Sequence, residues 1–285
     1  MWYNYWVACG NAPRGTEQAD GRTVMLLCPV CGKPLEKELN TMKCTAGHSY
    51  DVAKEGYVNL LRAGRPGDRI GDDAASCRAR RDFLNKGYYA PLRDRLKEIF
   101  AGKTGKLLDI CCGEGYYTSA LGTVEGLDVY GFDISREAVR LAAKRGGARY
   151  FVANMTSVPV PDGAFDFATH LFAPFCDGEF SRVLKKGGTL ITVLPGALHL
   201  WGLKRLLYEH PYENSEVLPD APSFVPVKTE SITYDVTVEG AEQINAVFRM
   251  TPYFFHTSRG DREKLEGIDR LETTLSFLIA EMEKK

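Results

Sequence analysis

The sequence lacks an apolar run long enough to span a membrane, and it contains no internal repeat or low-complexity tract. Its beginning also lacks the charged, apolar and small-residue pattern of a secretory signal, so we expect a cytoplasmic protein with no membrane partner. An excess of one charge is missing too, since 36 basic and 37 acidic residues leave a net charge of -1. This balance excludes a general electrostatic attraction to nucleic acid, and any polyanion site must be local.

Cysteine is too sparse for a disulfide-rich secreted scaffold, with 8 cysteines among 285 residues. The chain is 44% hydrophobic and 26% charged, which is ordinary for a globular protein of one large or two smaller domains. Residues 1–81 carry 12 basic and 9 acidic residues, so the basic excess lies towards the N-terminus. We therefore expect a local polyanion site in that part of the chain.

The chain divides into four predicted segments. Residues 1–24 show no sustained periodicity and are interpreted as an irregular N-terminal extension. Residues 25–62 hold a cysteine and histidine cluster with short strand-like pieces, and residues 63–75 form a polar, glycine-rich connector. Residues 76–285 are predicted to be the main domain.

Within the main domain, residues 76–100 predict two helices, the second with Pro91 in its first turn. From residue 106 short apolar strands alternate with helices, which is typical of an α/β protein with a parallel sheet covered on both faces. One of these helices is predicted at 177–187. The tail adds a strand near 223–236, a helix near 241–250 and a last strand near 273–282.

Cysteine and histidine form a C-x2-C-x12-C-x3-H array at Cys28, Cys31, Cys44 and His48. Two such pairs can surround one tetrahedral zinc ion, and four protein ligands leave no open position for water. We therefore predict structural zinc, which would supply folding energy that so short a segment cannot obtain from a core of its own. The alternative is four unrelated buried residues.

A glycine-rich turn follows the first predicted strand of the main domain. Gly113 and Gly115 allow close approach of a ligand, and Asp133, at the end of the next strand, is placed to accept ribose hydroxyl groups. The third glycine of a dinucleotide-binding turn is missing. Asp109 instead ends the first strand, which suits a cofactor with a cationic amino acid end.

This pattern points to S-adenosylmethionine. Asp109 would lie near its ammonium group, and Asn154 and Met155 would meet the adenine at the third strand tip. The candidate cofactor residues at the turn and strand tips are Asp109, Gly113, Glu114, Gly115, Tyr116, Asp133, Ile134, Asn154 and Met155.

Several longer stretches carry a resemblance to a known family. They read CPVCGKPL, CTAGHSYDVAKEGYVNLL, ARRDFLNKGYYAPLRD, LDICCGEGYYT, GFDIS, HLFAP, RVLKKGGTLITVLPGALHL and MTPYFFH, in family order from residue 25 to the C-terminal region. On these stretches the chain resembles the bacterial 23S rRNA guanine-N1 methyltransferases, which include members linked to macrolide antibiotic resistance.

The resemblance implies a Rossmann-like class I methyltransferase domain that uses S-adenosylmethionine, preceded by a small zinc-binding domain. Its sheet would be mostly parallel and seven-stranded, with the last strand antiparallel. The resemblance also implies cofactor contacts at Tyr89, Gly113, Glu114 and His199, although a surface position is the alternative for His199. The sequence departs from the family at Cys111, where the first glycine of the turn is usual, and Asn154 replaces the Asp or Ser of many relatives.

The implied reaction methylates N1 of a guanosine in a hairpin loop of 23S rRNA. N1 lies on the pairing edge of guanine, so the base must be unpaired or flipped. Phe172 and Phe175 are candidates for stacking on it, with ordinary core packing as the alternative. His170 is a candidate general base for the N1 proton.

RNA would first meet the zinc module and a group of arginines. An ordinary solvated surface is the alternative for each of them, because Asp68, Asp72 and Asp73 interrupt the run. The candidate RNA-binding arginines are Arg62, Arg65, Arg69, Arg78, Arg80 and Arg81.

Two other functions stay open at this point. A small-molecule methyltransferase would share the cofactor turn but has no reason for a zinc module. A non-catalytic zinc-ribbon protein that binds RNA or protein would have no reason to keep Gly113 and Asp133. The sequence also leaves open which guanosine is modified and whether the chain acts as a homodimer.

Overall fold

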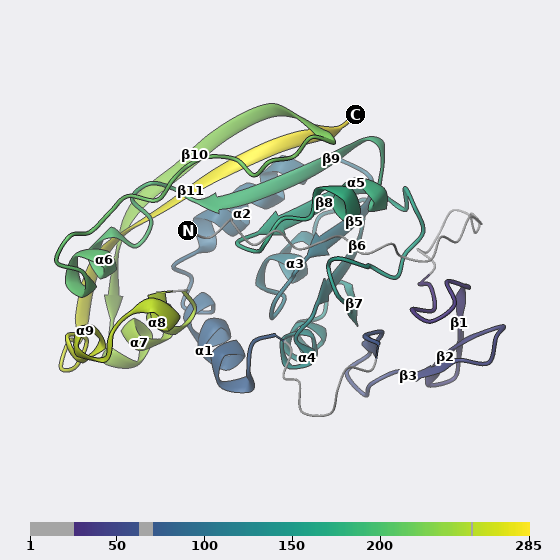
Figure 1. The fold of residues 1–285 in the computed structure, drawn as a ribbon, viewed down its shortest axis with the longest axis horizontal. Coiled ribbons are helices and arrows are strands. Elements are labelled where there is room, and N and C mark those ends of the chain that lie inside the picture. Colours follow the sequence, from purple (N-terminus) through teal and green to yellow (C-terminus); the bar gives the residue numbers. More distant parts are fainter. Residues whose placement is uncertain (1–25, 63–70, 252) are drawn as a thin grey trace.

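The computed structural model describes residues 26–62, 71–251 and 253–285 (Figure 1). The predicted extension at 1–24, most of the connector, and the candidate residues Arg65 and Arg69 lie outside these ranges.

An eight-stranded sheet forms the centre of the molecule, and helices pack on both of its faces (Figure 1). Its strands, in order from one edge to the other, are β10 (Phe224–Glu239), β11 (Arg270–Lys284), β9 (Leu184–Pro195), β8 (Phe165–Leu171), β5 (Gly105–Ile110), β6 (Leu127–Asp133), β7 (Arg149–Val152) and β4 (Val58–Asn59).

The strand directions match the predicted class I arrangement. Strands β4 to β9 pair in parallel, whereas β11 lies antiparallel between β9 and β10. The seven strands from β5 onwards therefore form the expected sheet, with the last strand in the chain antiparallel.

The eighth strand, β4, comes from the segment predicted as the zinc-binding module. Val58 and Asn59 pair with Phe151 and Val152 of β7, so the main sheet already begins before residue 62. A two-residue strand has no periodicity by which the sequence could reveal it.

The helices begin at local signals that the sequence contains. Asp73 and Ser135 accept hydrogen bonds from backbone N–H groups at the starts of α1 and α4, and Pro91 lies in the first turn of α2. The helices are α1 (Ala74–Leu84), α2 (Ala90–Phe100), α3 (Tyr116–Leu121), α4 (Arg136–Arg145), α5 (Asp177–Val183), α6 (Trp201–Leu207), α7 (Ala241–Arg249), α8 (Tyr253–His256) and α9 (Arg259–Glu263).

One predicted helix is shorter than expected. Residues 177–187 were predicted helical, but α5 ends at Val183 and β9 begins directly at Leu184. Leu184 pairs with Phe165, and Gly187 has a φ of +71°. Sheet pairing and this left-handed residue end the helix early.

The core lies on both faces of the sheet. Successive residues of β5 point to opposite sides, so that Leu107 joins the cluster containing Phe100 while Leu108 joins the cluster containing Phe132. Each of these side chains is fully buried. Packing on both faces therefore fixes the position of β5 and of the residues at its carboxyl end.

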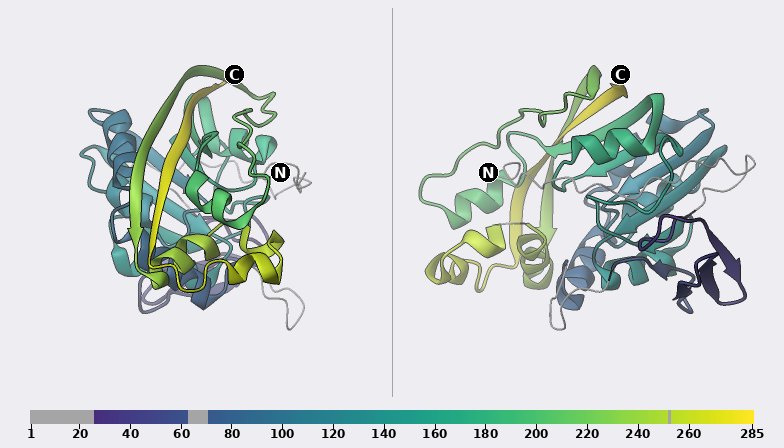
Figure 2. Two further views of the ribbon diagram at one scale, coloured as in Figure 1. Left: turned by 90° about the vertical axis from the view of Figure 1, so that its left-hand side faces the viewer. Right: turned by 45° about the vertical axis from the view of Figure 1, so that its right-hand side comes forward.

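The zinc module contains a small antiparallel sheet of β1 (Leu35–Glu38), β2 (Thr41–Cys44) and β3 (Ser49–Asp51). The Leu27 N–H donates to the Pro159 carbonyl at 2.8 Å, and Leu35 belongs to the same buried cluster as Val158 and Val160 of the main domain. The views in Figure 1 and Figure 2 place this module at one end of the molecule and α6 to α9 at the other.

Among the described residues, no helix is long and apolar enough to cross a membrane.

Candidate cofactor pocket and zinc site

The four predicted zinc ligands converge at one point. Their ligand atoms lie within 4.8 Å of one another. Sγ of Cys31 and Cys44 are 3.7 Å apart, and Nδ1 of His48 lies 3.4 Å from Sγ of Cys28 and of Cys44. A tetrahedral zinc ion needs edges of about 3.8 Å between sulfurs and about 3.5 Å between sulfur and nitrogen. The predicted site therefore fits zinc.

Tyr50 supports this site from β3. Its hydroxyl lies 3.2 Å from Sγ of Cys28, and a metal-bound thiolate there would accept a hydrogen bond from it. Leu27 and Leu35 are the only buried non-ligand side chains among described residues 26–51. With so few buried side chains of its own, the module would gain much of its folding energy from zinc.

A cavity of about 400 Å³ opens at the carboxyl ends of β5, β6 and β8, where class I folds bind ligands. Its walls come from distant parts of the chain. They include Asp72, Arg80, Leu84, Tyr89, Asp109, Cys111, Gly113, Glu114, Tyr116, Asp133, Ile134, Phe172, Pro195, His199, Arg249, Met250, Thr251 and Tyr253.

The turn from β5 to α3 contains three residues in the left-handed region. Cys111 has a φ of +58°, Gly113 of +56° and Gly115 of +82°. A non-glycine residue such as Cys111 costs about 1 kcal/mol in this conformation, which glycine would avoid. A Cβ on Gly115 would come within 2.8 Å of the Cβ of Ala142, so Gly115 lets α3 pack on α4. Gly115 does not line the cavity.

Asp109 lies buried at the base of the cavity. Its carboxylate accepts hydrogen bonds from Thr118 Oγ1 at 2.5 Å and Thr169 Oγ1 at 2.8 Å. Burial raises the pKa of Asp109 to about 6, although these hydroxyls lower it. A cation in the cavity would favour the ionised form.

Asp133 ends β6 and faces the same cavity. Its carboxylate accepts the backbone N–H groups of Gly113 at 3.0 Å and Ser135 at 2.8 Å. Burial raises its pKa, and the two N–H groups oppose that shift. They fix the carboxylate and leave further lone pairs free for ligand hydroxyls.

Glu114 is buried in the cavity wall and paired with one arginine. Its Oε2 lies 2.6 Å from Nε of Arg145, while its Oε1 has no hydrogen-bond partner among the described residues. Burial raises the pKa of Glu114, and the charge of Arg145 lowers it. An unpartnered buried carboxylate oxygen beside a cavity is the kind of group that a bound cation satisfies.

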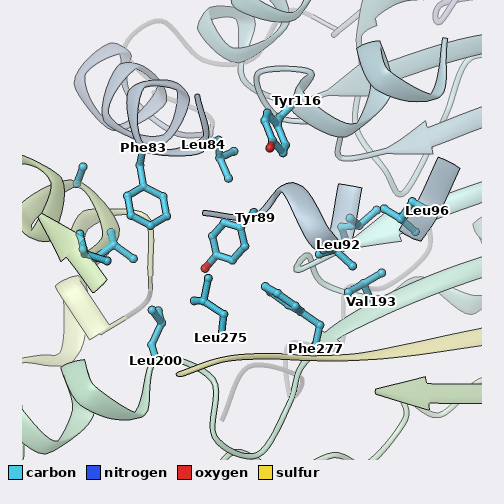
Figure 3. Close-up of a cluster of buried hydrophobic side chains, with 14 of the residues drawn as sticks. Phe83, Leu84, Tyr89, Leu92, Leu96, Tyr116, Val193, Leu200, Leu275 and Phe277 are labelled. Carbon is cyan, nitrogen blue, oxygen red and sulfur yellow. The ribbon is translucent and has the colours of Figure 1, made fainter. Parts of the chain in front are cut away.

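Tyr89 and His199 meet on the other side of the cavity. The Tyr89 hydroxyl lies 3.1 Å from Nε2 of His199. Burial lowers the pKa of His199 to about 3, so its ring is neutral at physiological pH. Figure 3 shows Tyr89 among Leu200, Leu275 and Phe277, which hold its ring in place. His199 is buried, so the alternative of a surface histidine does not hold.

Phe172 follows β8 and lies at the cavity wall. It is half-buried and has a φ of +55°. Its ring stacks on His199 with 6.4 Å between centroids and is tilted against Phe277 at 5.8 Å. A non-glycine residue in this conformation is a local strain of the kind found at binding sites.

His170 and Phe175 are not brought to the cavity. His170 is fully buried, its Nε2 lies 3.1 Å from the Pro174 carbonyl, and burial lowers its pKa to about 4. Phe175 packs edge-on against His170 and Phe180. The geometry thus gives His170 no route to a substrate proton, and the core-packing alternative describes Phe175.

Asn154 and Met155 also lie outside the described cavity walls. Asn154 Oδ1 accepts hydrogen bonds from the backbone N–H and hydroxyl of Thr156, and Met155 contacts the Cys111 thiol. They remain at the tip of β7, next to the turn.

The candidate arginines have different surroundings. Arg62 donates to the Pro29 carbonyl at 2.6 Å, which ties it to the zinc module, and Arg78 is exposed on α1. Arg80 pairs with Asp72 at 2.7 Å and lines the cavity, whereas Arg81 pairs with its neighbour Asp82.

One wall of the cavity was missed from the sequence. Arg249, Met250, Thr251 and Tyr253 reach it because α7 packs against α1. The MTPYFFH stretch was noted for its resemblance, but nothing in its local pattern shows that it meets the cofactor turn more than 100 residues earlier.

Comparison with known proteins agrees with this geometry. The family described as "RlmA, N-terminal" matches residues 26–64, and a general "Methyltransferase domain" matches residues 108–192. A 23S rRNA (guanine(748)-N(1))-methyltransferase of Streptomyces fradiae is 32% identical over 272 residues, which cover 89% of this chain and 95% of the relative. The chain belongs to this methyltransferase family.

Two more relatives carry similar names. Putative 23S rRNA (guanine-N(1)-)-methyltransferases of Micromonospora griseorubida and Bacillus subtilis are 33% and 31% identical, covering 61% and 65% of this chain and 67% and 69% of the relatives. The chain is thus an S-adenosylmethionine-dependent methyltransferase with a zinc-binding ribbon, and its fold is the predicted class I fold.

Proposed function

We propose that this protein transfers a methyl group from S-adenosylmethionine to N1 of a guanosine in a hairpin loop of 23S rRNA. The observation that carries the proposal is one cavity with two chemically different halves. The donor half, defined by Asp109, Gly113, Glu114 and Asp133, offers carboxylates. The acceptor half, defined by Phe172, Arg249 and Tyr253, offers rings and one cation, and His199 lies at the boundary between the two halves.

In the donor half, each group has a proposed role. Asp133 accepts hydrogen bonds from the ribose hydroxyls of S-adenosylmethionine, and the backbone of Gly113 covers this ligand. Glu114 and Asp109 face the ammonium end, where the free Oε1 of Glu114 gains a partner. Tyr116 and Ile134 complete the walls, whereas the predicted adenine contacts Asn154 and Met155 lie outside them.

Tyr89 and His199 hold the methionine end next to the acceptor half. Because the His199 ring is neutral, its Nε2–H can donate to the Tyr89 hydroxyl, which then points its own proton into the cavity. S-adenosylmethionine is thereby aligned before the guanine of the RNA enters the cavity.

In the acceptor half, the flipped guanine stacks on Phe172. S-adenosylmethionine supplies a sulfonium methyl group. Guanine N1 forms the new bond to carbon as the carbon–sulfur bond breaks, the electron pair stays on sulfur, and the N1 proton leaves to solvent. Since His199 already shares Nε2 with Tyr89, the contribution of this chain is alignment rather than base catalysis.

RNA would reach the cavity from the zinc module, with Arg62, Arg78, Arg80 and Arg81 contacting its backbone. The zinc ribbon favours an RNA substrate over a small molecule. Demethylmenaquinone methyltransferases also resemble this chain, but the one from Anoxybacillus flavithermus covers only 44% of it. Because the substrate is ribosomal RNA, we place the activity in the cytoplasm.

The test is methylation of 23S rRNA by the purified protein with labelled S-adenosylmethionine. Reverse transcription should stop at one guanosine, because an N1 methyl group blocks its pairing edge. Naked rRNA and the large ribosomal subunit should be offered in parallel, beside a metabolite pool. Label in the metabolite fraction and in neither RNA substrate would contradict the proposal.

A further inference from the structure

Two arginines share one aromatic ring beside the cavity. The guanidinium carbon of Arg249, at the end of α7, lies 5.1 Å from the centroid of the Phe254 ring. That of Arg262, in α9, lies 4.8 Å from the same centroid. We refer to Arg249, Phe254 and Arg262 as the arginine pair cluster.

Neither arginine is paired with a carboxylate among the described residues. Arg262 instead donates to two backbone carbonyls, those of Thr257 at 3.0 Å and Phe254 at 2.5 Å. The other cavity arginines differ, since Arg80 pairs with Asp72 and Arg145 pairs with Glu114. The cluster therefore holds two positive charges against one ring, and neither has a carboxylate partner among the described residues.

The acidic side chains near the cluster are engaged elsewhere. Asp73, which feels the charge of Arg249, accepts the Ser76 N–H at the start of α1. Asp261 pairs with Lys264 at 2.7 Å, and Glu263 pairs with Arg259 at 3.1 Å. The exposed Arg249 guanidinium is therefore open to an anion from outside the chain, with no carboxylate of the described residues competing for it.

Arg249 is the residue of the cluster at which such an anion would bind. It is exposed to solvent and lines the cavity on the acceptor side, together with Met250 and Tyr253. Cation–π contact with Phe254 keeps its side chain in place without neutralising it. A planar guanidinium at the rim of a base pocket is well suited to a phosphate group.

We propose that the arginine pair cluster binds a backbone phosphate of the RNA beside the target nucleotide, with Arg249 as the contacting residue. This inference rests on the proposed function and deepens it. It gives the end of the molecule opposite to the zinc module a part in holding RNA, so that the substrate is held on both sides of the cavity (Figure 2).

The experiment compares Arg249→Gln with wild-type protein. Binding of 23S rRNA is measured over a range of KCl concentrations, and binding of S-adenosylmethionine is measured by calorimetry. We expect RNA affinity to fall about fivefold or more at moderate salt, and the salt slope to decrease by about 0.7 to 0.9, as for loss of one phosphate contact. Affinity for S-adenosylmethionine should stay within about twofold.

Arg259→Gln is the matched control. Arg259 lies on α9 in the same part of the fold, its side chain is 94% exposed, and it pairs with Glu263. Its removal changes the net charge equally, so RNA affinity and salt slope should remain close to wild type. Arg249→Lys should retain the salt slope, because it keeps the charge, and lose part of the affinity.

Three outcomes would overturn the inference. An unchanged salt slope in Arg249→Gln would make Arg249 an ordinary surface arginine. If Arg249→Gln weakened S-adenosylmethionine binding and left RNA binding intact, Arg249 would instead contact the carboxylate of the cofactor's methionine part. Equal losses of RNA affinity in Arg249→Gln and Arg259→Gln would show that only the net charge of the protein matters. Failure of wild-type protein to bind or methylate 23S rRNA would instead refute the proposed function, and this inference with it.

Discussion

The two halves of the cavity are built in different ways. The donor half stands on the tips of β5 and β6, where short hydrogen bonds fix Asp109 and Asp133. The acceptor half is assembled from Phe172, which follows β8, and from the α7–α8 corner. Its rings are held by packing, and its exposed arginine is held by one aromatic contact.

This difference in construction corresponds to a difference in proposed function between the two halves. Under the proposed function, the groups fixed by the sheet bind S-adenosylmethionine, and the groups brought in by later segments meet the RNA. A variant in the donor half should therefore change cofactor affinity alone, and one in the acceptor half should change RNA affinity or turnover alone.

Removal of zinc should have the largest effect of all. It acts outside both halves of the cavity and tests whether they depend on the zinc module. Removing zinc with a chelator should unfold residues 26–51, because structural zinc supplies on the order of 10 kcal/mol to such segments. S-adenosylmethionine affinity should stay unchanged, since no zinc ligand lines the cavity, while RNA affinity falls. Hydrogen exchange locates the unfolding and calorimetry measures the affinity. A parallel loss of cofactor affinity would show that the halves depend on the module.

Asp133→Ala should give the largest effect within the donor half. Loss of two hydrogen bonds from a carboxylate to ribose hydroxyls should weaken S-adenosylmethionine about 100-fold or more, with RNA affinity kept. Asp128→Ala is the control, because Asp128 lies on the same strand and pairs at the surface with Arg149. Calorimetry on the two variants decides, and similar affinities would remove Asp133 from the ribose site.

Phe172→Ala should show the opposite behaviour. Loss of one stacking contact costs roughly 1 to 3 kcal/mol, so methyl transfer to rRNA at low RNA concentration should fall about tenfold. S-adenosylmethionine affinity should be unchanged. Phe175→Leu is the control, since Phe175 packs against Phe180 away from the cavity. If Phe172→Ala weakened the cofactor instead, Phe172 would belong to the donor half.

Arg145→Met should change the pH dependence of the donor half by a smaller amount. Arg145 lowers the pKa of Glu114, which burial raises. Without Arg145 the pKa of Glu114 rises further, so the carboxylate is protonated, and cofactor affinity lost, at a higher pH than in wild type.

The measurement is the cofactor dissociation constant from pH 5 to 8. Arg140→Met is the control, because Arg140 lies on the same helix but pairs with Glu137 at the surface. An Arg145→Met profile that overlays wild type would show that Glu114 does not contact the cofactor in its ionised form. Thermal unfolding checks that both variants remain folded.

The donor half could be predicted from the sequence because it is local. A strand, a glycine turn and a helix place Asp109, Gly113 and Glu114 together without knowledge of the rest of the fold. The zinc ligands were found for the same reason, since their spacing within 21 residues determines their geometry.

The acceptor half depends on packing that local patterns do not encode. Arg249 reaches the cavity only because α7 packs on α1. His170 is buried on the opposite side because strand neighbours alternate, and its neighbour Thr169 bonds Asp109. An apolar strand buried on both faces gives no sign of which residue points to the ligand.

The most direct test is a crystal structure of the protein with S-adenosylhomocysteine, the product of the donor. The ribose hydroxyls should lie within hydrogen-bond distance of the Asp133 carboxylate, with the sulfur facing Phe172 across the boundary of the two halves. A ligand whose ribose lies at the α7–α8 corner, or whose sulfur points away from Phe172, would contradict the division of the cavity into donor and acceptor halves.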